Sequence, residues 1–214
     1  MPETRLGPTT EAIIERFEAT SAARDRALAD GRQIIRLSAN SIRATHRGED
    51  GDAERLLADA RRLLSEMINH VADYPSVYWA GYVQDAMKEY AEAAITRDFV
   101  NGNLDVPTPD ELGVEDAPYL NALAEAASEV RRDALDALRL NQLDHAERLL
   151  ACMDTVYDIL VSIDFPDAIT GGLRRRTDQL RGVLERTRGD LTITLSQQRL
   201  ERALAETQRK MDID

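Results

Sequence analysis

Apolar residues recur every three or four positions along most of this chain, which is the spacing of one face of an α-helix. The longest such run ends at His46 and has Thr9 or Thr10 as its predicted N-cap. Six further helices are predicted, and Ser76 is the predicted cap of the third helix of the chain. These six cover about residues 56–71, 82–99, 117–138, 146–160, 172–186 and 190–211.

No segment alternates polar and apolar residues over a useful length, so we predict no β-strand. The predicted fold class is all-α: a single-domain bundle of about seven helices over residues 1–214, with a long N-terminal helix. Residues 101–117 are rich in Pro, Gly, Asn and acids and form the one substantial internal loop. An apolar strip for a partner subunit could come from the long first helix or from Leu191, Leu195, Leu200 and Leu204, although packing within the chain is the more common arrangement.

The third helix has an apolar face and an acidic face. Its apolar face is predicted to hold Trp79, Val83, Ala86, Met87, Tyr90 and Ala94, with Asp85, Glu89 and Glu92 roughly opposite. A face of this kind is either a solvent-exposed surface, which is the more frequent case, or a metal site.

Two pairs of acids bear on that choice. Glu89 and Glu92 are three residues apart, and Glu125 and Glu129 on the next helix are four apart, so each pair shares a helix face. Like charges at these spacings cost a helix roughly 0.2–0.5 kcal/mol per pair, so helix stability does not explain them. If the two helices face each other, the carboxylates form an oxygen-only cage of the kind that suits Mg²⁺ or Mn²⁺. Such an ion could activate water and hold a phosphate oxygen during hydrolysis.

The other metal-ligand and nucleophile candidates are weaker. The only histidines, His46, His70 and His145, are far apart in the sequence, and none completes the Glu-x-x-His motif of di-iron bundles. Cys152 lies on an apolar helix face and is expected in the core. A single cysteine excludes an intramolecular disulfide and, with no signal peptide, predicts a reducing cytoplasm. No apolar run is long enough for a membrane span.

The net charge of −12 argues against nucleic-acid binding unless the positive charge is clustered. Two basic clusters are present, and they are the candidate nucleic-acid contacts: Arg43, His46 and Arg47, and then Arg174, Arg175 and Arg176. The alternative is that most of the arginines between 174 and 188 pair with nearby carboxylates, namely those of Asp178, Glu185 and Asp190.

Several blocks taken together resemble the translin family, in particular its branch of translin-associated factor X (Trax). The blocks span nearly the whole chain in order and cover residues 81–93, 119–132, 153–158, 173–178 and 185–190. The resemblance implies an all-helical subunit that assembles into a hollow octamer and binds single-stranded RNA or DNA. For the Trax branch it also implies a metal-dependent endoribonuclease site of acids that face the interior.

The family's acidic site matches this chain residue by residue. Its Glu-Tyr-x-Glu motif falls on Glu89 to Glu92, and its second part falls on Glu125 and Glu129. The resemblance implies Mg²⁺ or Mn²⁺ held mainly by Glu92 and Glu129, with Glu89 and Glu125 completing the site or positioning water. Here Glu125 stands where the family often has Asp, and Ser128 stands where it has Gly, so the metal geometry could differ.

Two functions follow as hypotheses. The first is a metal-dependent endoribonuclease that cleaves single-stranded or short structured RNA inside a closed homo-oligomer, an octamer in the family pattern. The second is a non-catalytic oligomer that binds single-stranded RNA or DNA, in which the acids are structural, and a helical scaffold without a nucleic-acid role is a third reading. The absence of a basic import signal leads us to expect a prokaryotic, archaeal cytoplasm, and the basic clusters contact either nucleic acid or neighbouring subunits.

Overall fold

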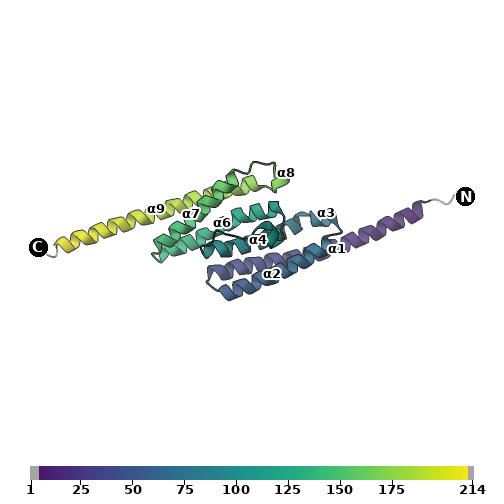
Figure 1. Ribbon diagram of the computed structural model, residues 1–214, viewed down its shortest axis with the longest axis horizontal. Coiled ribbons are helices and arrows are strands. Elements are labelled where there is room, and N and C mark those ends of the chain that lie inside the picture. Colours follow the sequence, from purple (N-terminus) through teal and green to yellow (C-terminus); the bar gives the residue numbers. More distant parts are fainter. Residues whose placement is uncertain (1–4, 212–214) are drawn as a thin grey trace. The chain divides into compact units, whose positions relative to one another are not determined.

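The structure, a computed structural model, describes residues 5–211, and these residues contain nine helices and no strand. Six helices are long: α1 (Leu6–His46), α2 (Asp50–Val71), α4 (Gly81–Val100), α6 (Asp116–Arg139), α7 (Leu143–Val161) and α9 (Leu173–Met211). Three are single turns: α3 (Pro75–Tyr78), α5 (Pro109–Leu112) and α8 (Asp167–Thr170) (Figure 1). The predicted all-α class and the long N-terminal helix are confirmed.

Three local predictions are wrong. The helices predicted over 172–186 and 190–211 form one helix, α9, because Gly189 between them costs only about 1 kcal/mol relative to Ala and does not stop a helix. Neither Thr9 nor Thr10 caps α1, which begins after Arg5, and both hydroxyls donate back to carbonyls of the preceding turn. Ser76 lies inside α3 rather than at the cap of the next helix.

Contacts divide the chain into two compact units. One contains the residues up to Ala94 together with Pro107–Tyr119, and the other contains Ile95–Val106 and the residues from Leu120 onward. Two of the three boundaries fall within α4 and α6, and the third, between Val106 and Pro107, lies in the segment that connects α4 to α5. The single domain expected over the whole chain stays a prediction.

In the first unit α1 and α2 lie side by side, and α3 packs against both (Figure 1). Small residues on α1 allow a close approach, because a Cβ at Gly31 would lie 3.4 Å from the Tyr82 carbonyl oxygen and 3.8 Å from the Ala86 Cβ. Ala27 and Ile34, one turn to either side of Gly31, are completely buried. This contact fixes the first turns of α4 against α1 and so orients the acids that follow.

The predicted loop over residues 101–117 contains an ordered turn. Thr108 and Glu111 form a capping box around α5, and the carbonyl oxygen of Glu111 accepts a hydrogen bond of 3.0 Å from Arg61 Nη2 on α2. Nearby, the Tyr78 hydroxyl donates to the carboxylate of Glu115. These bonds fasten the second half of the loop to the first unit.

The second unit is built on α9. It packs against α7 through a buried apolar seam that includes Leu149, Met153, Leu180 and Leu184. Arg131 on α6 donates to Thr187 Oγ1 and Asp190 Oδ2, both at 2.9 Å, and so joins α6 to α9. Cys152 is 5% exposed, which confirms its predicted place in the core. Among residues 5–211 no helix is long and apolar enough to cross a membrane.

Candidate functional site

Helix α4 is buried on almost every side around its middle. Val83, Met87 and Tyr90 on the predicted apolar face are buried, but so are residues on the opposite side. Trp79 does not belong to this face, since it lies at the C-cap of α3 with 61% of its surface exposed. The centroid of its ring lies 5.0 Å from that of the Tyr78 ring, in an edge-to-face arrangement. The apolar face that was predicted to start at Trp79 therefore begins only at Val83.

The acids of α4 differ in their exposure. Asp85 is exposed, Glu89 is half-buried, and Glu92 is buried with 8% of its surface exposed. A solvent-exposed acidic face is therefore the wrong description for Glu92. Burial of a carboxylate is costly unless it is compensated by hydrogen bonds, opposite charge or a metal ion, so its presence here needs a specific reason.

Lys88 is a buried cation beside these acids, and sequence reasoning missed it. The residue is 8% exposed, and its Nζ lies 2.8 Å from Glu89 Oε1. The composition did set Lys88 apart as a residue to consider, because Lys88 and Lys210 are the only two lysines among the 27 Lys and Arg residues. An ammonium at this position places a compact positive charge next to Glu89, one of the predicted catalytic acids.

Three of the four predicted acids, Glu89, Glu92 and Glu125, form a group that could hold a metal ion through one carboxylate oxygen each. We call these three residues the acidic group. A set of oxygen donors without nitrogen or sulfur fits Mg²⁺ or Mn²⁺ and does not fit a structural zinc site. Glu129, the fourth predicted acid, is half-buried and is not a member of the group found among the described residues.

Glu125 has a cationic neighbour of its own. It forms an ion pair with Arg176 of α9, and each of the two side chains is 27% exposed. Arg176 was predicted to contact nucleic acid, but in this structure its guanidinium faces a predicted catalytic carboxylate. Two members of the acidic group thus carry a positive partner, Glu89 through Lys88 and Glu125 through Arg176.

The first basic cluster is partly satisfied by its neighbours. Arg43 is exposed and donates to Asn40 Oδ1 at 2.6 Å, and Arg47 pairs with Glu49. That hydrogen bond with Arg47 lowers the pKa of Glu49 below its ordinary value. His46, between the two arginines in sequence, is half-buried.

The second basic cluster is more open. Arg174 and Arg175, at the start of α9, are exposed and have no hydrogen bond or ion pair within residues 5–211. The predicted pairing with Asp178 is absent from the described part of the chain, whereas Arg188 does pair with Glu185 at 3.1 Å. This end of α9 therefore carries unneutralised positive charge in an otherwise acidic protein.

No protein-family model matches the chain. An uncharacterised protein of Methanocaldococcus jannaschii is 29% identical over 200 residues, which covers 92% of this chain and 87% of that protein. The structure of AfC3PO in complex with duplex RNA matches with a TM-score of 0.81 and 33% identity, over 88% of this chain and 97% of that one. A crystal structure of AfC3PO matches with a TM-score of 0.80 and 32% identity, over 88% of this chain and 97% of that one.

Apo-NeC3PO shares the fold with a TM-score of 0.78, at 18% identity, over 87% of this chain and 97% of that one. The likeness to AfC3PO combines an identity above 30% with nearly complete coverage, and it agrees with the order of the sequence blocks that resemble translin. The chain therefore belongs to the C3PO family of translin-like proteins.

Proposed function

We propose that this protein is a metal-dependent endoribonuclease that cleaves single-stranded or short structured RNA at the acidic group. The observation that carries the proposal is that Glu89, Glu92 and Glu125, predicted from sequence as catalytic acids, form a set of carboxylates that could hold one cation. A group assembled from separate sequence motifs is harder to explain as surface charge than either pair alone.

The burial and the partners of each acid support a proposed role for it. Glu92 is the most buried acid and has little freedom to move, so it suits a fixed ligand of Mg²⁺ or Mn²⁺. Glu89 and Glu125 are half-buried and can exchange a cationic side chain for a metal ion or a water molecule. Glu129, one turn beyond Glu125 on α6, stays in the proposal as a further ligand or as the group that orients the attacking water. A bound divalent ion would supply an activated water and neutralise the phosphate.

RNA is the proposed nucleic-acid partner, and single-stranded DNA stays a secondary candidate. AfC3PO has been solved with duplex RNA, which supports structured RNA as a ligand, whereas single strands enter the proposal through the resemblance to translin. Arg174 and Arg175 supply exposed, unneutralised charge for phosphate contacts. Because the net charge is −12, we expect binding to be confined to such a basic surface and to weaken steeply as salt is added.

A closed homo-oligomer, an octamer in the family pattern, is the proposed assembly. The outer halves of the two longest helices expose apolar side chains, with Ile14 and Phe17 on α1 and Leu200 and Leu204 on α9 each more than half exposed. Leu191 and Leu195 of the same α9 series pack within the chain. Large exposed apolar residues in a row are typical of a surface that another subunit covers. The proposed location is the cytoplasm.

The test is cleavage of labelled single-stranded and duplex RNA with Mg²⁺, Mn²⁺ or a chelator. We expect Glu92→Gln to lower the cleavage rate by about a hundredfold or more, the scale of losing one transition-state-stabilising group. Asp85→Asn is the matched control, since Asp85 lies on the same helix but is exposed and outside the acidic group. Metal-stimulated cleavage that survives in Glu89→Gln and Glu92→Gln alike would refute the site.

A second function, RNA binding without cleavage, is favoured by one observation. Lys88 and Arg176 already neutralise Glu89 and Glu125, so the acids could serve as structural ion pairs. In that case RNA binds at low salt, no metal produces cleavage, and substitutions in the acidic group change protein stability only. A gel-shift assay run beside the cleavage assay separates the two functions.

A further inference from the structure

Two side-chain cations partly neutralise the acidic group, and they differ in how firmly they are held. Lys88 directly precedes its partner Glu89 on α4, and 10% of its side chain is exposed. Arg176 reaches Glu125 from another helix, and 27% of its side chain is exposed. A partly exposed ion pair contributes little net free energy, because water competes for both charges. Arg176 is therefore the cation that can leave its partner, whereas Lys88 has little room to move.

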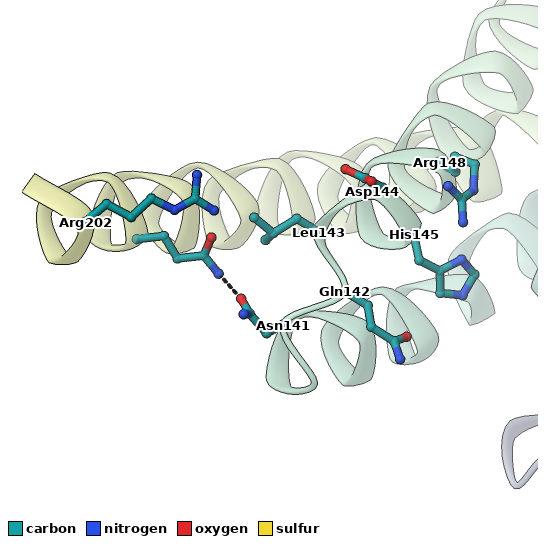
Figure 2. Close-up of a pocket in the computed structure, with 8 residues that line it drawn as sticks. Asn141, Gln142, Leu143, Asp144, His145, Arg148 and Arg202 are labelled. Carbon is teal, nitrogen blue, oxygen red and sulfur yellow. Dashed lines mark hydrogen bonds between the residues drawn. The ribbon is translucent and has the colours of Figure 1, made fainter. Parts of the chain in front are cut away.

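Hydrogen bonds other than this ion pair fix α9 beside α6. On its N-terminal side, Asn121 Nδ2 of α6 donates to the carbonyl oxygen of Thr170 at 2.7 Å, and both residues are buried. On its C-terminal side, Arg131 of α6 donates to two side chains of α9. Further along α9, the Gln198 amide donates to Asn141 Oδ1 in the α6–α7 connection, the bond drawn as a dashed line in Figure 2. Because these bonds lie on both sides of the ion pair, the guanidinium can change partner while the two helices stay in place.

A divalent ion at the acidic group changes the balance of charge around Glu125. Three carboxylates face two side-chain cations, Lys88 and Arg176, and a divalent ion raises the positive charges from two to four. Cations that share one carboxylate repel each other at short range, so the ion favours the departure of Arg176. The residues before it on α9, Arg174 and Arg175, are exposed and have no hydrogen bond or ion pair within residues 5–211. A phosphate group that binds at this basic surface offers the released guanidinium a bidentate partner.

We propose that Arg176 couples metal binding to RNA binding: it leaves Glu125 when a divalent ion binds there and then contacts a phosphate group of the RNA. The inference rests on the proposed function, because it takes a divalent ion and RNA as the ligands of this site. By thermodynamic linkage, each ligand then raises the affinity of the protein for the other.

Calorimetric titration of the full chain with Mn²⁺ tests the first half of this exchange. Arg176→Met removes the competing charge, so we expect Mn²⁺ to bind about fivefold more tightly than to wild type, the equivalent of one partly exposed ion pair. Arg176→Gln, which keeps a polar side chain, should show the same gain. If Arg176 only orients Glu125, both variants bind Mn²⁺ less tightly instead. Arg181→Met is the matched control, an exposed arginine of the same helix outside the acidic group and without an ion pair in residues 5–211, and its Mn²⁺ affinity should equal that of wild type.

Fluorescence anisotropy tests the second half, with a labelled 2′-O-methylated single strand whose integrity is checked on a gel. Each phosphate contact steepens the dependence of log affinity on log salt by about 0.7 for a single strand. In the presence of a chelator, wild type and Arg176→Met should have the same slope, because Glu125 holds the guanidinium. With Mn²⁺ the wild-type slope should be steeper than that of the variant by about 0.7, the signature of one additional contact.

The two titrations separate this inference from the proposed nuclease. Lower Mn²⁺ affinity in Arg176→Met, or equal slopes of wild type and variant with Mn²⁺, would overturn the coupling, and the nuclease stands if wild type still cleaves RNA with metal. A steeper wild-type slope already in the chelator would show that Glu125 does not hold Arg176, with the same consequence. Both expected results without cleavage would support the coupling and refute the nuclease. If wild type binds no Mn²⁺, both are wrong.

Discussion

The ion pair between Lys88 and Glu89 allows a quantitative test of how the candidate site is held together. Lys88→Met removes the ammonium but keeps an unbranched apolar chain, and Glu89→Gln removes the charge of the carboxylate but keeps its shape. Lys88 makes interactions besides the one with Glu89, so a single substitution cannot isolate the pair. A double-mutant cycle can, because those other losses cancel.

The expected magnitude follows from distance and exposure. Two unit charges 2.8 Å apart attract by about 6 kcal/mol at an effective dielectric constant of 20 and by about 1.5 kcal/mol in water. The Lys88 side chain is 10% exposed and that of Glu89 is 27% exposed, so the pair lies between these limits and also carries a desolvation cost. Because the desolvation cost of each residue cancels in the cycle, we expect a coupling free energy of about 2 kcal/mol, near the lower limit, and a loss of about 2–3 kcal/mol for Lys88→Met alone.

Urea unfolding followed by circular dichroism gives the free energy of unfolding of the four proteins of the cycle. Protein concentration must be equal in all four, because association would add to the apparent free energy of unfolding. The two single variants should together lose more free energy of unfolding than the double variant loses. If they instead add to within about 0.5 kcal/mol, the two groups do not interact in solution, and Lys88 is not what holds Glu89 in place.

Three further predictions concern groups away from the acidic group. Burial and the hydrogen bond to Glu115 raise the pKa of Tyr78 from 10.0 to about 12, so the folded state keeps this proton longer than the unfolded state does. Stability should therefore fall as pH rises from about 10 to 12, and Tyr78→Phe, compared with wild type in urea titrations, should remove part of that fall. Thr108→Ala breaks the capping box, and amide hydrogen exchange at Glu111 should accelerate on the order of fivefold; unchanged exchange would show that the cap is not formed. Burial raises the pKa of Cys152 to about 12, so a thiol reagent at pH 8 should modify the unfolded chain readily and the folded chain slowly, and equal rates would contradict its burial.

The chain's helices were predictable because their signal is local. Apolar spacing marked each long helix, and Pro and Gly marked most of the breaks between them. Where local signals competed, prediction failed. A break was predicted between residues 186 and 190, where Gly189 lies, yet α9 continues through it because Thr187 and Leu191 on either side are buried. Thr9 was predicted as a cap, yet its hydroxyl donates to the carbonyl oxygen of Arg5, one turn earlier in the chain.

The candidate acids were also predictable, since their pairing at three and four residues and their family motif are features of the sequence. Their environment was not. Spacing places Glu89 and Glu92 on one face but cannot say whether solvent, a cation or another helix meets that face. Three features exist only in the folded chain. Glu92 is buried, Lys88 pairs with Glu89, and Glu125 pairs with Arg176, which is 51 positions further along the chain. The sequence thus determined which chemical groups are available, through short-range periodicity. The fold decided their solvation and charge partners, because these depend on residues that are far apart in the chain and adjacent only after folding.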